Sequence, residues 1–90
     1  MKAVVLEDVE KMAVRELPDP AARPREVVLR VRAVGVCGTD LHLFRGHGNY
    51  NLDQQGRPVP LSQQPQILGH EFSGQVVEAG RAVQDLKPGD

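Results

Sequence analysis

The chain is poor in cysteine and in aromatic residues, and it has no marked excess of charge of either sign. Cys37 is its only cysteine, which excludes an internal disulfide framework and fits the reducing cytoplasm where we expect the protein to reside. Phe, Tyr and Trp together make up 3% of the 90 residues. Lys and Arg number 11 against 12 Asp and Glu, so the formal net charge is −1. This balance argues against a nucleic-acid partner, because such proteins carry a clear basic excess.

Long apolar runs are missing too. The first apolar run, residues 3–6, is too short for the apolar region of a signal peptide, and the acidic residues Glu7 and Asp8 follow it at once. No run approaches the roughly 18–20 residues that a membrane span requires, and no polybasic patch is present. We therefore expect no membrane partner.

The sequence is rich in residues that form turns. Nine glycines and seven prolines favour short strands joined by turns over long helices. Residues 2–6 and 12–17 predict a β-hairpin, and residues 26–36 predict the clearest strand, with side chains alternating at period two. Residues 72–79 predict a further strand, with a bulge or a close backbone approach at Gly74. We therefore expect a mainly β fold built from antiparallel strands.

One short helix and one long loop are predicted between these strands. Residues 39–46 fit a helix in which Thr39 or Asp40 is the N-cap and Gly46 ends the last turn. Residues 47–66 are rich in Gln, Asn, Gly and Pro and predict a loop of 20 residues. Structureless loops of this length are uncommon in a compact domain and are usually functional or disordered.

Side chains that bind metals stand at the ends of predicted strands. Cys37 follows one strand, and His70 and Glu71 precede another. Zinc binds thiolate, imidazole and carboxylate groups, and Asp40 could accept a hydrogen bond from the second nitrogen of a ligating histidine. On the residues alone, other interpretations stay open. A lone cysteine is more often a small buried apolar residue, and a lone histidine or glutamate is more often hydrogen-bonded or solvated.

Linked motifs resemble those of one enzyme family along essentially the whole chain. The segments are GVCGTDLH at residues 35–42, GHEFSG at 69–74, a glycine at Gly80 and KPGD at 87–90. Together they are similar to the zinc-dependent medium-chain alcohol dehydrogenases. The long stretch that separates the first two segments resembles the butanediol, threonine and sorbitol dehydrogenase branch of that family.

The resemblance implies a fold and a domain organisation. The fold would be a GroES-like, partly open antiparallel barrel with a short helix and a long loop, truncated before the Rossmann domain. Residues 1–90 would form the N-terminal part of the catalytic domain, and no cofactor-binding domain lies within them. No G-x-G-x-x-G dinucleotide fingerprint occurs in the sequence, which agrees with that expectation.

The resemblance also implies a metal site. Cys37 and His70 resemble the first two ligands of the family's catalytic zinc, and a third ligand is expected beyond residue 90. Glu71 resembles an acidic neighbour that ligates the zinc in some members and lies next to the ligands, without binding the zinc, in others. Asp40 resembles the carboxylate that orients the ligating histidine.

The implied activity is zinc-dependent oxidation of a small alcohol or diol by hydride transfer to NAD or NADP. Thr39 resembles the hydroxyl residue that touches the substrate oxygen, and His42 resembles a histidine that relays the proton. The alternative for His42 is a solvated residue on the helix surface. The nicotinamide would be bound by the domain absent from residues 1–90, and the parent protein is expected to be a homo-oligomer.

Two other interpretations of the sequence stay open. The chain could be a truncated, non-catalytic fragment that acts at most as a weak metal-binding module. It could also be a zinc-free relative of the quinone-reductase type, although such proteins generally lack the pair formed here by Cys37 and His70.

Overall fold

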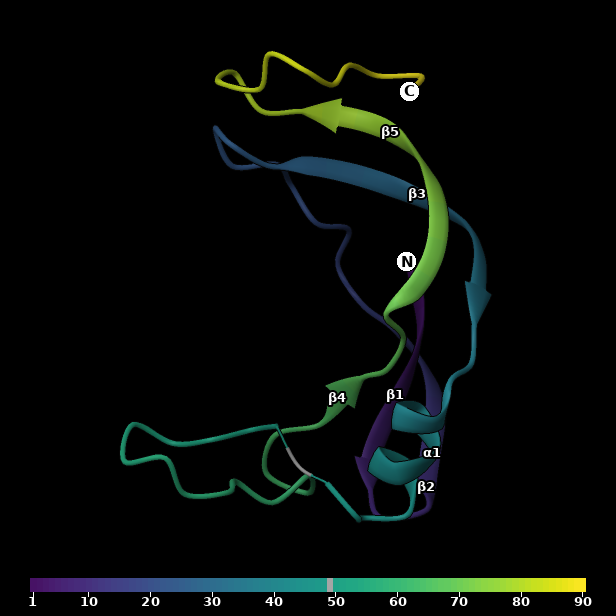
Figure 1. Cartoon of the computed structure of the whole chain (residues 1–90), viewed down its shortest axis with the longest axis vertical. Helices are drawn as coiled ribbons and strands as arrows, with labels where there is room; N and C mark the ends of the chain where they lie inside the picture. Colours follow the sequence, from purple (N-terminus) through teal and green to yellow (C-terminus); the bar gives the residue numbers. More distant parts are fainter. Residues whose placement is uncertain (49) are drawn as a thin grey trace. The chain divides into compact units, whose positions relative to one another are not determined.

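The computed structural model describes residues 1–48 and 50–90, and it is mainly β with one short helix, as predicted (Figure 1). Its elements are β1 (Lys2–Asp8), β2 (Lys11–Glu16), β3 (Val27–Gly35), α1 (Gly38–Phe44), β4 (Gln66–Ile67) and β5 (Glu71–Ala79). The chain divides into two compact units. The first contains Met1–Leu17 and Val36–Gly69, and the second contains Pro18–Gly35 and His70–Asp90.

The first unit is built on a three-stranded antiparallel sheet with the strand order β2-β1-β4. The hairpin predicted at the start of the chain is confirmed, with Leu6 opposite Met12. Its turn places Glu10 at φ 56°, because a tight hairpin turn requires left-handed backbone conformations. A short hairpin of this kind aligns β1 to receive β4 on its other edge.

The core of the first unit forms around β1, the central strand. Leu6 is fully buried and packs with Leu43 of α1 and Leu61 of the long loop. Phe44 and Leu68 pack against this cluster and are partly buried. The apolar face of α1 and a loop residue therefore cover the same side chain of β1, and burial of apolar surface is the main driving force that joins them.

The long loop is locally ordered rather than structureless in the part that the structure describes; its Asn49 lies outside the described residues. Leu52 and Pro58 form an isolated antiparallel bridge, and between them Asp53 accepts hydrogen bonds from the backbone N–H groups of Gln55 and Arg57, both at 2.9 Å. Side chains of this type close turns by bonding to the backbone two or more residues ahead. The tip of the loop is thus a compact turn held by one carboxylate.

A second polar residue ties the base of the loop. The Asn51 side-chain amide donates to the backbone oxygen of Gln64 at 2.6 Å, and its Oδ1 accepts from Gln66 at 2.7 Å. Asn51 therefore links the outgoing segment of the loop to the segment that enters β4. Together with the buried Leu61, these bonds explain how a sequence rich in Gln and Pro is fixed without regular structure.

The second unit contains the antiparallel pair β3-β5, whose two strands run side by side in Figure 1. The predicted close approach at Gly74 is confirmed. A Cβ atom at this position would lie 3.0 Å from the backbone oxygen of Arg30, and the register shifts between Val31 and Ala33. On the outer edge of β5, Val76 exchanges backbone hydrogen bonds with Gly89 and Asp90, each 2.8 Å long.

Neither sheet closes on itself in the described residues, so the barrel is open. Part of the β3-β5 pair remains exposed, with exposed fractions of 52% for Val31, 57% for Val34 and 54% for Phe72. The alternation that predicted β3 is present, but it does not bury that part of the strand. No helix in residues 1–48 and 50–90 is long and apolar enough to cross a membrane.

The substitution Leu6→Ala should destabilise the full-length protein by about 2–5 kcal/mol, because it removes a fully buried side chain and leaves a cavity beneath α1. Urea unfolding followed by circular dichroism measures this change. Val14→Ala is the matched control, since Val14 is 64% exposed on β2 and its truncation should have little effect. Equal losses in the two variants would contradict the assignment of the core.

The loop tip should respond to pH through Asp53. The backbone N–H of Arg57, followed by that of Gln55 and by the Arg57 side chain, holds the pKa of this carboxyl below its ordinary value. The turn is therefore stabilised above the ordinary aspartate pKa and loses that stabilisation as the pH falls through the lowered value. Amide exchange of Gln55 and Arg57, followed by NMR, should show protection that disappears in acid. Asp53→Asn should remove this pH dependence, and unchanged protection far below the ordinary pKa would argue against it.

Candidate metal centre

The first turn of α1 places Cys37 and Asp40 together. Cys37 is the N-cap and is still extended, with φ −115° and ψ 176°, and the helix begins at the next residue. The Asp40 carboxylate reaches back and accepts the Cys37 backbone N–H at 3.0 Å, as an acidic residue three positions after an N-cap commonly does. The sequence predicted Thr39 or Asp40 as the N-cap, and this assignment was wrong by two or three residues. β3 delivers an extended chain as far as Cys37, so the cap falls there.

The structure brings three of the predicted site residues together. Cys37, Asp40 and His70 each offer one ligand atom, and these atoms lie within 4.8 Å of one another. Asp40 is 8% exposed, Cys37 is half-buried and His70 is exposed. A thiolate, an imidazole and a carboxylate are the ligand types that zinc prefers.

Backbone connectivity explains why Cys37 and His70 meet although 32 residues separate them in the sequence. At the end of the β3-β5 ladder, Gly35 is paired with Glu71. Cys37 follows Gly35 by two residues and His70 precedes Glu71 by one. Consecutive Cα atoms are about 3.8 Å apart, so this single pairing keeps the two side chains within a short reach of each other.

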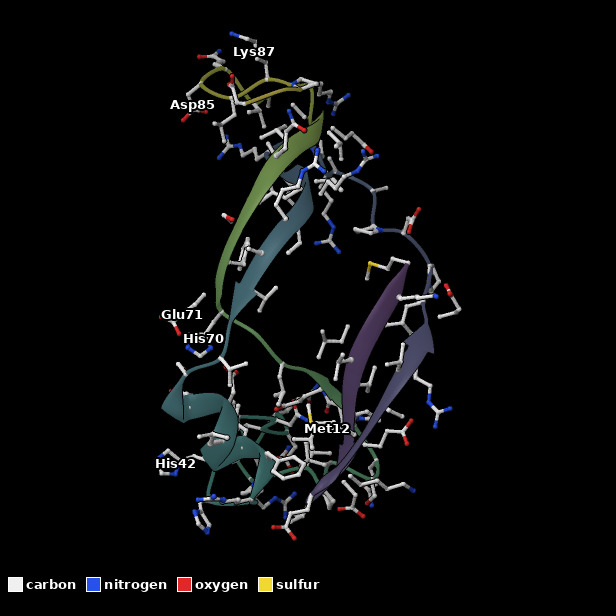
Figure 2. All side chains as sticks on the ribbon, turned by 90° about the vertical axis from the view of Figure 1, so that its right-hand side faces the viewer. Met12, His42, His70, Glu71, Asp85 and Lys87 are labelled. Carbon is white, nitrogen blue, oxygen red and sulfur yellow. The ribbon has the colours of Figure 1, made fainter. Side chains whose placement is uncertain are left out.

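Glu71 is not a member of the cluster formed by the described residues. Its side chain lies beside Gly35 of β3, where a Cβ atom would be 3.8 Å from Glu71 Oε2. Figure 2 shows Glu71 next to His70 at the start of β5. Its expected role at the metal stays a prediction, whereas Asp40, expected only to orient the histidine, contributes a carboxylate to the cluster itself.

Thr39 and His42 both lie on α1, three residues apart. Residues with this spacing are neighbours on one helix face. Thr39 is half-buried and His42 is exposed, and Figure 2 shows His42 projecting from the helix. A hydroxyl group near the start of the helix and an imidazole open to solvent can form the two ends of a proton path.

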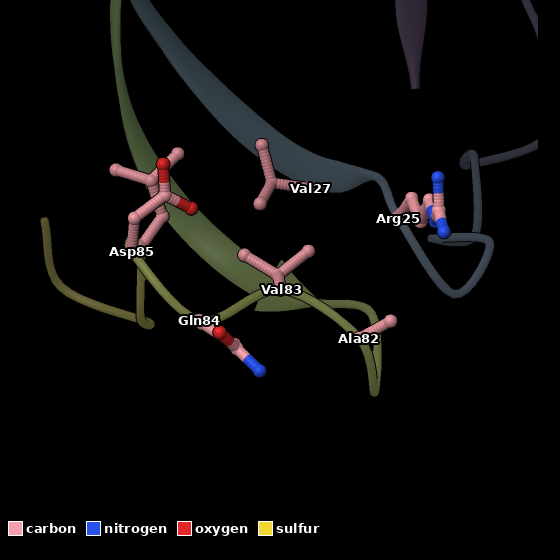
Figure 3. Close-up of a pocket in the computed structure, with 7 residues that line it drawn as sticks. Arg25, Val27, Ala82, Val83, Gln84 and Asp85 are labelled. Carbon is pink, nitrogen blue, oxygen red and sulfur yellow. The ribbon is translucent and has the colours of Figure 1, made fainter.

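A separate hollow of about 540 Å³ lies in the second unit (Figure 3). It is lined by Arg25, Val27 and residues 82–86, and none of the predicted site residues contributes to it. The hollow therefore supplies no part of the candidate metal centre.

The chain matches a family of known proteins over most of its length. Residues 23–90 match the family described as the alcohol dehydrogenase GroES-like domain. The chain is 44% identical to sorbitol dehydrogenase 1 of Saccharomyces cerevisiae, with 98% of this chain and 23% of the relative aligned. It is 43% identical to an L-threonine 3-dehydrogenase of Streptomyces avermitilis, with 100% of this chain and 24% of the relative aligned. The chain thus spans about a quarter of the length of these relatives.

Solved structures agree with the sequence relatives. A protein from Sinorhizobium meliloti 1021, described as a zinc-binding dehydrogenase and solved with NADP bound, superposes with a TM-score of 0.79 at 42% identity. The aligned region covers 98% of this chain and 22% of that one. Threonine and sorbitol dehydrogenases were expected from the length of the loop before His70, and the relatives confirm that expectation. The chain belongs to the alcohol dehydrogenase GroES-like domain family.

Proposed function

We propose that residues 1–90 form the N-terminal part of the catalytic domain of a zinc-dependent dehydrogenase that oxidises a small alcohol, diol or polyol with NAD or NADP. The observation that carries this proposal is the convergence of Cys37, Asp40 and His70 within 4.8 Å. The names of the aligned sorbitol and threonine dehydrogenases support the substrate class. The zinc-binding, NADP-bound structural relative supports the cofactors.

The donor set fits zinc. Cys37 and His70 would hold the ion through sulfur and nitrogen, and one further ligand is expected from outside residues 1–90. When bound, zinc supplies Lewis-acid polarisation of the substrate oxygen. Asp40 is fixed by the Cys37 N–H at one of its oxygens, so its carboxylate is held in place to orient the histidine or to complete the ligand set.

Thr39 and His42 would move the proton that the alcohol loses. The Thr39 hydroxyl can accept a hydrogen bond from the substrate hydroxyl and pass on its own proton, because Thr39 is only half-buried in the first turn of α1. The His42 imidazole would accept that proton and release it to water, to which its side chain is exposed.

The nicotinamide would be bound by a domain outside residues 1–90, since these residues contain no Gly-rich dinucleotide fingerprint. The division into a catalytic segment and a separate cofactor domain is therefore part of this proposal. So is the expectation that the parent protein is a homo-oligomer.

The substitutions Cys37→Ala and His70→Ala should each remove the bound zinc and lower the rate of alcohol oxidation by about a hundredfold or more. Lewis-acid stabilisation of the reacting oxygen is worth several kcal/mol, and that energy is lost with the ion. The measurement pairs elemental analysis of the purified full-length variants with steady-state kinetics on a panel of diols, polyols and threonine.

Arg45→Ala is the control, because this exposed side chain lies outside the cluster, offers no metal ligand and should leave zinc content and rate unchanged. Unchanged zinc and rate in both ligand variants would refute the proposal. A protein that binds zinc through Cys37 and His70 but oxidises no member of the panel would instead favour a weak metal-binding module.

Asp40→Asn separates the electrostatic role of this residue from its structural role. The amide oxygen can still accept the Cys37 N–H, so α1 should keep its cap while the negative charge at the metal is lost. Zinc affinity, measured by competition with a chelator, should fall about 10–100-fold. Asp40→Ala should also lose about 0.5–2 kcal/mol of stability, because this variant loses the hydrogen bond that caps the helix as well as the negative charge. Wild-type zinc affinity in the asparagine variant would show that Asp40 acts only as a cap.

A further inference from the structure

We propose that His42 and His47 form a second, surface binding site for a divalent transition-metal ion such as Ni²⁺, Cu²⁺ or Zn²⁺. Their rings face one another at the C-terminal end of α1, with centroids 6.0 Å apart and planes inclined by 43°. Both side chains are exposed, so an ion can reach them from solvent. Nothing in the resemblance to medium-chain dehydrogenases gives His47 a role.

The backbone beneath the two imidazoles is fixed. Gly46 has φ 78° and donates to the Leu43 oxygen at 3.1 Å, and His47 donates to the His42 oxygen at 2.9 Å. These two bonds form a Schellman motif, the arrangement that commonly ends a helix at glycine. The predicted helix stop at Gly46 is therefore confirmed, and it ties His47 to the residue whose ring it faces.

The hairpin of the same unit holds this helix end in place. The backbone N–H of Glu10 donates to the Phe44 oxygen at 2.8 Å. A Cβ atom at Gly46 would lie 2.9 Å from a methyl carbon of Val9, so the turn packs closely against the tip of the hairpin. Little backbone entropy remains to be lost when an ion binds, which favours affinity.

The ring spacing suits one shared ion. Imidazole nitrogens bind zinc at about 2.0–2.1 Å, which places the centroids of two rings on one ion roughly 5–6 Å apart. The observed 6.0 Å is at the upper end of this range, so small side-chain rotations suffice. Neutral imidazole suits zinc, copper and nickel, and waters can fill the remaining positions. Magnesium and calcium prefer oxygen ligands and should not compete.

The two histidines stand apart from the candidate metal centre, because the three-residue cluster of Cys37, Asp40 and His70 includes neither of them. Occupation of the surface site would nevertheless affect the reaction. The His42 nitrogen that binds the ion donates its lone pair to it and can no longer accept a proton. This consequence for activity rests on the proposed function, whereas the binding itself does not.

Isothermal titration of the zinc-loaded, full-length protein with NiCl₂ tests the binding, with elemental analysis to show that the original zinc is retained. We expect one Ni²⁺ per chain. His42→Ala and His47→Ala should each weaken binding roughly tenfold or more, because the second imidazole binds within the same molecule. Arg45→Ala is the matched control at the same helix end and should bind Ni²⁺ at least as well as the wild type. Equal binding by wild type and His47→Ala, or no binding by wild type, would overturn the site.

Kinetics in the presence of Ni²⁺ test the consequence. Wild-type activity should fall as the surface site fills, while His47→Ala should keep its basal activity and resist the ion. Nickel binding without inhibition would support the site and contradict the relay role of His42. If the protein oxidises no alcohol at all, the proposed function fails and the titration alone decides whether the site exists.

Discussion

The backbone pairing of Gly35 with Glu71 is the constraint on which the candidate metal centre depends. This pair ends the β3-β5 ladder. Beyond it, β3 continues through Gly35 toward Cys37, and β5 is entered from His70. Antiparallel pairing aligns residues across the two strands, and a slip by one residue would turn the following side chains to the opposite side. The close approach at Gly74 and the register shift near Val31 belong to the same ladder, so they also fix where it ends.

A second constraint acts at the start of α1. The hydrogen bond from the Cys37 N–H to the Asp40 carboxylate satisfies a donor that the helix would otherwise leave open. It also holds a negative charge beside the only thiol of the chain. This one hydrogen bond thus both stabilises the helix and positions the ligands. Two different substitutions of Asp40 are therefore needed to distinguish the effect of its charge from the effect of the cap. The core around Leu6 supports this arrangement by holding the helix through Leu43, three residues after Asp40.

Much of the fold followed from patterns in the sequence, because alternation and turn residues are local signals. The hairpin, β3, β5 and the helix stop at Gly46 were all predicted within a few residues. The N-cap was missed, because the extended conformation of Cys37 comes from the preceding strand and not from its own residue type. The order of the long loop was also missed, because burial of Leu61 and the two bonds of Asn51 depend on segments distant along the chain.

The candidate site shows the same division between local and distant signals. Cys37 and His70 were singled out by their chemical type and by the motifs around them, and only the strand pairing could bring them together. The i, i+3 spacing from Cys37 was the signal that could have found Asp40 as a member of the ligand cluster. His47 carried no such signal, because its relation to His42 depends on the left-handed backbone of Gly46.

The loop that joins α1 to β4 is held at its base by Asn51 and by the buried Leu61, and its tip closes on itself through Asp53. The isolated bridge between Leu52 and Pro58 separates the tip from the base of the loop. Sequence changes between these two residues therefore alter the tip and leave the helix and the strand in place. Related proteins could lengthen, shorten or rewrite this tip during evolution while the cysteine and histidine on either side of the loop kept their geometry. The sequence of these twenty residues can therefore diverge while the chemistry of the residues that flank them stays constant.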